Sequence, residues 1–237
     1  MKLGVITDIH NNSGALEAVL SELSAQECER ILCGGDLIGI GPEPEATVQR
    51  MMHLPGCVAV RGNHEGYLLD GMDEARMGRE EYQYHLWEHA RLSQTSIDYL
   101  RSLPYALDLT VEGVRIHLVH APRSARQGGY MPLTPHPTPE QLAQWFHAVD
   151  ADVICYGHDH ARCIAQAEGK WFVNAGSLGC PMHDGDLARA AILTVENGSA
   201  AVTPLDVRYD ANAVVARIDR LNYPAAQEVK SIFFSKT

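Results

Sequence analysis

The sequence predicts an α/β fold, and two patterns along the chain carry that prediction. In the first part of the 237-residue chain, short apolar runs alternate with segments of helical periodicity. In the second part, apolar and polar residues alternate at strand spacing, and several strand-like runs follow. With 46 % hydrophobic and 21 % charged residues, the composition is that of a folded globular chain, so disorder and collagen-like repeats are excluded.

The first part of the chain predicts three strands that alternate with helices. Asn12 and Ser13 are good N-cap residues, and the apolar residues that follow them recur at helical spacing. A longer helix is expected over residues 80–102, where Pro104 stops it. The strands are expected at residues 3–7, 31–33 and 57–60, and a further helix at residues 45–54.

The second part of the chain predicts mainly strands. The expected strands lie at residues 114–118, 153–156, 171–174, 190–194 and 201–205. The proline-rich residues 132–139 predict a loop, and a helix through Trp145 follows it. Since no internal repeat, low-complexity tract or linker separates two cores, we expect a single domain over residues 1–237.

Charge and cysteine content indicate which partners are disfavoured and which cellular compartment is expected. Thirty acidic against 19 basic residues give a net charge of −11, which disfavours long nucleic acids and acidic membranes as partners. The six cysteines form no C-x-x-C pair, so we expect free thiols in a reducing cytoplasm. No apolar run approaches the roughly 18 residues of a membrane span. An acidic chain with 12 histidines remains to be explained.

Polar residues follow several of the expected strands at the point where each strand ends. Open α/β sheets build their sites at the carboxyl ends of their strands. Imidazoles and carboxylates together suit divalent metals such as Mn, Fe or Zn. Each cluster alone is a weak signal, but their repeated placement predicts a metal site. The residues are Asp8, His10, Asp36, Asn63, His64, His120, His158 and His160.

Taken in order, these clusters resemble the signature of the calcineurin-like metallophosphoesterases. Residues 35–42 and 174–179 resemble the small bacterial and archaeal branch of that superfamily, and the resemblance covers residues 1–205. It implies a four-layer αββα sandwich of two mixed β-sheets flanked by helices. Residues 67–102 would form a helical cap segment at one edge of the site.

The resemblance also implies a centre of two divalent metal ions, with Mn favoured over Fe, Zn or Ni. His64 would stay free of metal and protonate or stabilise the leaving alkoxide, oriented by either Glu65 or Asp159. The two ions would share a bridging hydroxide that attacks phosphorus. Asp8, His10 and His160 would hold one ion, Asn63, His120 and His158 the other, and Asp36 would bridge both.

For each of the other candidate residues, a purely structural role is an alternative to a functional one. His85 and His89 are spaced to chelate a metal, but without a third ligand nearby we expect a solvated helix face. Arg123 is a candidate for contact with a substrate phosphate, and a surface arginine is an equal alternative; the same holds for Arg61. Tyr67, Tyr130 and Trp87 are candidates for stacking on a nucleobase, with packing favoured for at least two of them. Cys180 is expected to be a buried thiol, and His117 to occupy the second face of its strand. His53, His136, His147 and His183 have no assigned task.

The sequence therefore predicts a metal-dependent enzyme that hydrolyses a small, soluble phosphate ester, with a phosphodiester favoured. A phosphomonoesterase, including a protein phosphatase, and a dinucleoside polyphosphate hydrolase stay open. A non-catalytic, metal-binding interaction scaffold would predict gaps in the ligand set, and none is present. A zinc deaminase or peptidase is disfavoured because neither H-E-x-x-H nor H-x-E with P-C-x-x-C occurs. An oligomer is possible.

Overall fold

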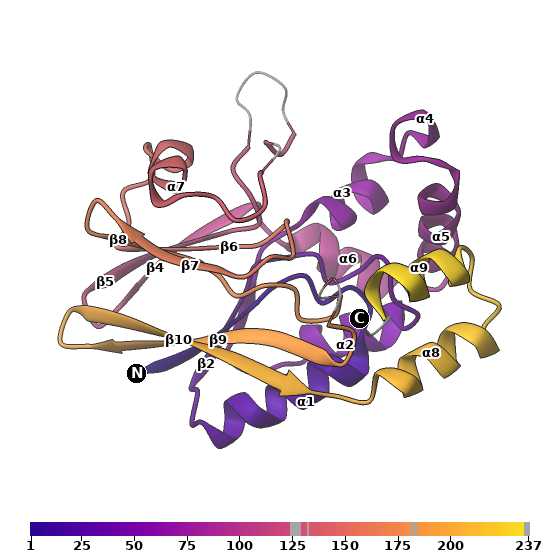
Figure 1. Ribbon diagram of the computed structural model, residues 1–237, viewed down its shortest axis with the longest axis horizontal. Coiled ribbons are helices and arrows are strands. Elements are labelled where there is room, and N and C mark those ends of the chain that lie inside the picture. Colours follow the sequence, from indigo (N-terminus) through magenta and orange to yellow (C-terminus); the bar gives the residue numbers. More distant parts are fainter. Residues whose placement is uncertain (124–128, 132, 181, 183, 235–237) are drawn as a thin grey trace.

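Two five-stranded β-sheets lie face to face in the computed structural model, which describes residues 1–123, 129–131, 133–180, 182 and 184–234 (Figure 1). The first sheet has the order β10-β9-β1-β2-β3 and the second β4-β5-β6-β8-β7. The first contains β1 (Lys2–Ile6), β2 (Arg30–Cys33), β3 (Cys57–Ala59), β9 (Leu187–Glu196) and β10 (Ser199–Arg208). The second contains β4 (Ala106–Val111), β5 (Val114–Val119), β6 (Val153–Tyr156), β7 (Cys163–Ala167) and β8 (Lys170–Asn174).

Both sheets are mixed, with parallel strands next to antiparallel ones. β1 pairs in parallel with β2 and antiparallel with β9, so that Val5 lies opposite Leu32 on one side and Ala191 on the other. β6 pairs in parallel with both β5 and β8. The parallel strands place their carboxyl ends at one edge of each sheet, and the loops that carry the candidate residues start there.

The alternation of side chains along β1 shows how the layers are held together. Leu3 and Val5 point into the core between the two sheets, where Ile116 of β5 and Val153 of β6 are also buried. Ile6 belongs to the other face, which packs against helices. Because neighbouring residues of a strand face opposite sides, one apolar run can serve two cores.

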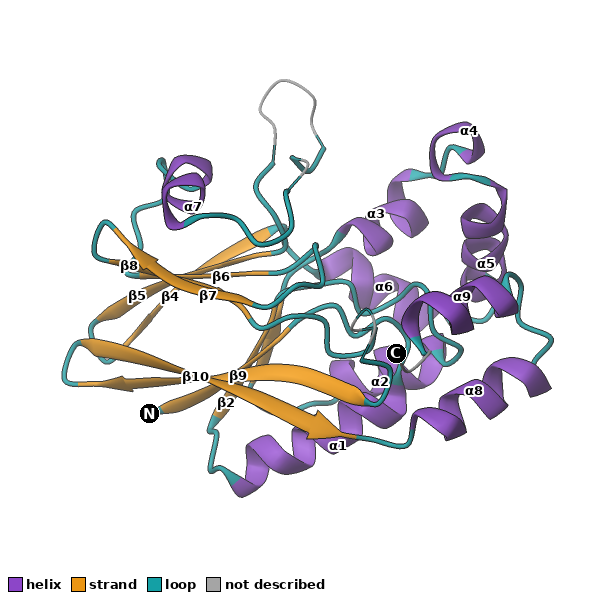
Figure 2. Ribbon diagram, in the orientation of Figure 1, coloured by secondary structure: helices purple, strands orange, loops and turns teal. Residues whose placement is uncertain are grey.

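Helices cover the outer face of each sheet (Figure 2). α1 (Ser13–Ala25), α2 (Pro44–Met52) and α6 (Gln94–Ser102) bury apolar residues in the core on the first sheet, and α7 (Pro139–Trp145) covers the second. The predicted αββα sandwich of two mixed sheets is therefore confirmed. The remaining helices gather beside the strand ends: α3 (Asn63–Asp70), α4 (Glu74–Met77), α5 (Arg79–His89), α8 (Ala211–Arg220) and α9 (Ala226–Phe233).

Several expected elements differ from the structure. The helix expected over residues 80–102 is two helices, because Ser93 caps a new one: its Oγ accepts a hydrogen bond from Ser96 N at 3.2 Å. Asn63 and His64, which the sequence places just after a strand end, are the first two residues of α3. The edge strands β4 and β7 were not predicted, since they are only partly buried. The helices α8 and α9 were not predicted either, although each has a clear apolar face. Among the described residues, no helix has the length and apolar character that crossing a membrane requires.

Candidate metal centre

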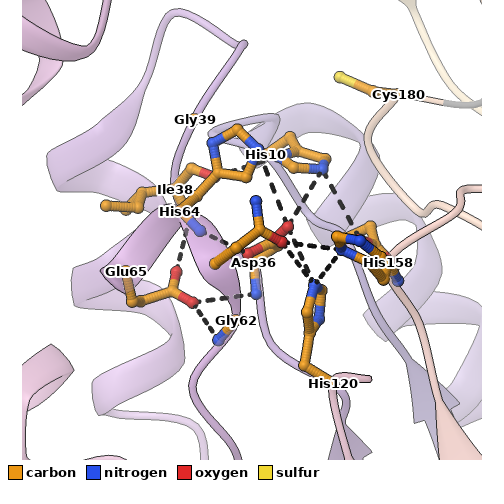
Figure 3. A network of polar contacts seen from close by, with 12 residues as sticks. His10, Asp36, Ile38, Gly39, Gly62, His64, Glu65, His120, His158 and Cys180 are labelled. Atoms are coloured by element: carbon orange, nitrogen blue, oxygen red, sulfur yellow. Dashed lines mark hydrogen bonds and ion pairs between the residues drawn. The ribbon is translucent and has the colours of Figure 1, made fainter. Parts of the chain in front are cut away.

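The candidate ligands lie together in one place, on the loops that follow the strands (Figure 3). Asp8 and His10 come after β1, Asp36 after β2, and His120 after β5. These loops belong to both sheets, so the centre lies where the carboxyl ends of the two sheets meet. Asn63 begins α3, His64 is the next residue, and His158 and His160 follow β6.

Asp8, His10 and His160 form a first group of ligand atoms. The Nδ1 atoms of His10 and His160 donate to the carbonyls of Ile38 and Cys180, each at 3.1 Å. Their Nε2 atoms therefore carry lone pairs, and these two atoms lie 2.8 Å apart. Asp8 Oδ1 lies 3.8 Å from His10 Nε2 and 3.7 Å from His160 Nε2. Two lone pairs and a carboxylate thus converge on one point, an arrangement that fits a cation.

Asn63, His120 and His158 form a second group. His120 Nδ1 donates to the carbonyl of Gly34 at 2.8 Å, so its Nε2 is the atom that faces the centre. Burial opposes a charge on His120, but Asp36 outweighs it and raises the pKa of His120 to about 9, so a metal ion at Nε2 would replace a proton. This Nε2 lies 3.0 Å from Asn63 Oδ1, which is an acceptor. His158 Nδ1 lies 2.9 Å from the same Asn63 oxygen and 3.3 Å from His120 Nε2. Here too, ring nitrogens and an amide oxygen converge on one place, as ligands around a metal ion do.

Asp36 lies between the two groups. Its Oδ2 is 3.3 Å from His120 Nε2 and 4.0 Å from His10 Nε2, while its Oδ1 accepts from His64 N at 2.9 Å. Burial alone would raise the pKa of Asp36, but the charge and hydrogen bond of His120 outweigh burial and hold it well below its usual range. The carboxylate is therefore ionised and faces both groups of histidines.

The backbone at these ligands is unusual. Asp8, His10, Asp36, His158 and His160 all have positive φ angles, between 51° and 86°. This left-handed region is unfavourable for residues other than glycine, and such residues cluster at functional sites. The fold therefore holds these side chains in directions that an ordinary strand or turn would not give them.

Glu65 supports the ligand loops from beneath. Its carboxylate is fully buried and accepts hydrogen bonds from the backbone N–H groups of Asp36, Leu37, Ile38 and Gly62, at 2.7 to 3.2 Å. Burial, together with the charge of Asp36, raises the pKa of Glu65 to about 7. Gly62 is required there, because a Cβ at this position would lie 2.0 Å from Asp36 Oδ1.

The role expected of Glu65 or Asp159, to orient His64, does not fit their contacts. Glu65 is occupied by the backbone groups, and Asp159 Oδ1 accepts from Asn174 Nδ2 at 2.6 Å. His64 is 7 % exposed, its Nε2 lies 3.8 Å from Asp36 Oδ2, and its Nδ1 has no hydrogen-bond partner among the described atoms. Burial lowers the pKa of His64 well below its usual value despite the Asp36 carboxylate, so the ring is neutral.

The contact that sequence reasoning missed comes from α5. The expectation that His85 and His89 lie on a solvated helix face, with no third ligand nearby, is wrong. His85 and Glu88 are both 0 % exposed, His89 is half-buried, and Glu88 Oε1 lies 2.6 Å from His85 Nδ1 and 3.7 Å from His89 Nε2. Glu88 Oε1 accepts from His85 Nδ1, and Oε2 accepts from Asn11 Nδ2 at 2.6 Å and Gly39 N at 2.7 Å. This carboxylate thus ties α5 to the loops after β1 and β2, and the His85 ring lies 5.0 Å from that of His64.

Of the three aromatic candidates, Tyr130 and Tyr67 contact histidines of the centre, and Trp87 packs elsewhere. Tyr130 packs against His120 and His158, with ring centroids 5.4 and 5.9 Å away. Tyr67 packs against His64 at 5.4 Å, whereas Trp87 packs against Tyr223 at 4.7 Å.

The two candidate arginines both contact Tyr105. The guanidinium of Arg123 stacks on this ring at 3.8 Å, and that of Arg61 lies 4.8 Å from it and donates to the carbonyl of Arg101. Cys180 is a buried thiol, as predicted, and His117 pairs with Asp108 of β4 at 2.8 Å. His53 and His147 bond to backbone carbonyls of their own segments, His136 is exposed, and His183 lies outside the described residues.

Comparison with known proteins agrees with this geometry. Residues 1–198 match the calcineurin-like phosphoesterase superfamily domain. The chain belongs to this superfamily. The matched stretch contains every candidate ligand of both groups, while β10, α8 and α9 follow it.

Three relatives of this phosphoesterase superfamily member extend over nearly the whole chain. An uncharacterized protein of Methanocaldococcus jannaschii is 26 % identical, over 94 % of this chain and 93 % of its own. The solved metallophosphoesterase from Sphaerobacter thermophilus is 24 % identical with a TM-score of 0.76, covering 97 % of this chain and 98 % of its own. A hypothetical protein from Pyrococcus horikoshii is 20 % identical with a TM-score of 0.81, covering 100 % and 99 %. These likenesses support the fold, including the elements after residue 198.

Proposed function

We propose that this protein hydrolyses a small phosphate ester, in the first place a phosphodiester, with the help of two divalent cations, Mn²⁺ being preferred. One observation carries the proposal: Asp36 Oδ2 lies 3.3 Å from His120 Nε2 on one side and 4.0 Å from His10 Nε2 on the other, and each ring is held by its Nδ1 on a backbone carbonyl so that Nε2 faces the carboxylate. A carboxylate between two such groups is the arrangement that a pair of cations needs.

In this proposal each ion has its own ligands. Two divalent cations bound there would neutralise phosphate oxygens and lower the pKa of a water molecule, so that it serves as the nucleophile at neutral pH. Asp36 would be shared by both ions. Asp8, His10 and His160 would hold the first ion, and Asn63, His120 and His158 the second.

His64 would act on the leaving group. Its imidazole is neutral, so it carries one N–H, and its Nε2 faces the centre beside Asp36. We propose that this N–H donates to the leaving oxygen as the phosphorus–oxygen bond breaks. Arg123, whose backbone pairs with that of Tyr130 next to His158, is the candidate for contact with a substrate phosphate oxygen.

The charge of the chain bears on the substrate. With a net charge of −11, the surface repels long polyanions, so attraction to phosphate must come from the cations in the centre. A small ester that reaches this buried centre fits better than a nucleic acid. A diester and a monoester each release one alkoxide per cleavage, which one neutral histidine beside the centre can protonate; we propose the diester first, and the assay below decides between them.

The test compares bis-p-nitrophenyl phosphate, p-nitrophenyl phosphate and diadenosine tetraphosphate as substrates of the Mn²⁺-loaded protein. The proposal expects the highest kcat/KM for the diester. A faster monoester or dinucleotide would overturn the diester assignment. No turnover of any phosphoester with both ions bound would favour the interaction scaffold instead.

A further inference from the structure

A pocket of about 260 Å³ opens directly beside the candidate metal centre, between α5 and α9. His64 and His160 form the part of its wall that belongs to the centre, so the pocket and the centre are continuous. His64 is only 7 % exposed, and its Nδ1 has no hydrogen-bond partner among the described atoms. A group that leaves from phosphorus next to His64 would enter this pocket.

The far wall of the pocket is one face of α9. It is lined by Glu228 and Val229 and, one turn further along, by Ile232 and Phe233. The Phe233 ring lies 6.1 Å from that of His160. Figure 1 shows α9 beside α5. Since α9 lies outside residues 1–198, the part of the chain that matches the superfamily domain, this wall is an addition to the shared domain.

The opposite wall comes from α5, through Glu81 and the buried ring of Tyr84. Apart from the two histidines, the ionisable groups in the wall are Tyr84 and the carboxylates of Glu81 and Glu228; the described lining residues include no lysine or arginine. Glu81 Oε1 also faces His85 Nε2 at 3.8 Å, while Glu228 is exposed. The pocket therefore combines aromatic rings with negative charge.

Aromatic faces next to carboxylates attract alkylated ammonium groups, because the ring quadrupole and the carboxylate charge both favour a cation. A second phosphate would be repelled by the same carboxylates. The volume of about 260 Å³ lies below the roughly 300–1,000 Å³ of sites for drug-sized ligands. The size and charge thus fit a small amino alcohol better than a nucleoside polyphosphate.

We propose that the pocket between α5 and α9 binds the leaving alcohol of the substrate and selects one that carries an ammonium group, such as a choline-like alcohol. This inference rests on the proposed phosphoesterase function. In the reaction, water adds its hydroxyl to phosphorus, the bond from phosphorus to the alcohol oxygen breaks, and the alcohol leaves with a proton. In this reaction Glu81 and Glu228 attract the cation and take no part in proton transfer.

The experiment uses two diesters of the same shape, methyl phosphocholine and methyl 3,3-dimethylbutyl phosphate, of which the second lacks the charge. Phosphorus NMR follows the formation of methyl phosphate by the Mn²⁺-loaded full-length protein. We expect kcat/KM to be roughly tenfold higher for the choline ester, the size of effect that a partly desolvated cation site gives. The double variant Glu81→Gln with Glu228→Gln should bring the ratio close to one, whereas Glu80→Gln, an exposed residue of the same helix, should leave it unchanged.

A second measurement separates this inference from the proposed function. Free choline and 3,3-dimethylbutan-1-ol contain no ester, so NMR titration gives their dissociation constants whether or not the protein is an enzyme. Tighter binding of choline, lost in the double variant, supports the pocket even if no ester is cleaved. Equal kcat/KM for the two esters, or equal binding of the two alcohols, overturns the inference even if both esters are cleaved.

Discussion

The substitution Glu88→Gln tests how α5 is fixed to the ligand loops. Glu88 is fully buried and accepts from His85, Asn11 and Gly39. Burial opposes a charge on His85, but Glu81 and Glu88 outweigh it and raise the pKa of His85 from 6.5 to about 9. Glutamine keeps the shape of the side chain and removes its charge, so the pKa of His85 should fall, while Glu81 continues to raise it.

The magnitude follows from the two pKa values of His85. A pKa of about 9 in the folded chain against 6.5 in the unfolded chain contributes about 2.5 kcal/mol to the free energy of unfolding at pH 7. Because the folded-state pKa is the higher one, this contribution is complete below pH 6.5 and disappears as the pH rises through 9. Because Glu81 keeps part of this shift, the wild type should exceed Glu88→Gln in stability by about 1 kcal/mol at pH 7, and by much less at pH 10.

Urea unfolding at pH 7 and pH 10, followed by tryptophan fluorescence, measures this difference. Groups that titrate in both proteins cancel when the two are compared. Glu80→Gln, on the exposed side of the same helix, is the control and should change stability by less than about 0.5 kcal/mol. A gap between wild type and Glu88→Gln that is equal at both pH values would refute the ion pair as its cause.

Other substitutions address the centre itself. Asp36→Asn removes the shared charge and should lower kcat/KM for bis-p-nitrophenyl phosphate by more than about 100-fold; near-normal turnover would contradict the bridging role. His64→Ala should keep its metal content by elemental analysis and lose about 10²- to 10⁴-fold in kcat for esters with poor leaving groups, with a smaller loss when p-nitrophenolate leaves. Glu65→Gln should lower the free energy of unfolding by about 2–4 kcal/mol, measured by urea titration, because an amide group would face backbone donors. Dialysis against EDTA should abolish hydrolysis, and added Mn²⁺ should restore it.

The position of the candidate centre was predictable because it depends on strand ends. An apolar run followed by Asp8, Asp36 or His120 marks a loop at the carboxyl edge of a sheet, and parallel strands bring such loops together. The layers of the fold were predictable from the periodicity of apolar residues, because buried strands and amphipathic helices each have a clear pattern. The edge strands β4 and β7, which are only partly buried, leave weaker ones.

The supports of the centre were not predictable from the sequence. Nothing in the sequence around Glu88 distinguishes it from a glutamate on the exposed face of a helix. It is buried only because the loops after β1 and β2 pack against α5, where Asn11 and Gly39 donate to its carboxylate. The left-handed backbone at Asp8 and His160 leaves no compositional sign, since both residue types also occur in ordinary turns. Ser93 could have predicted the break in the helix expected over residues 80–102, because serine is a preferred residue at the start of a helix and Ser96 N donates to its Oγ here.

The central claim is that Asp36 joins two cation sites. Elemental analysis of the Mn²⁺-loaded protein, combined with anomalous diffraction from its crystals, tests this claim most directly. The account predicts two ions per chain, one beside His10 and His160, the other beside His120 and His158, with Asp36 between them. A single ion per chain, or ions bound away from Asp36, would contradict it.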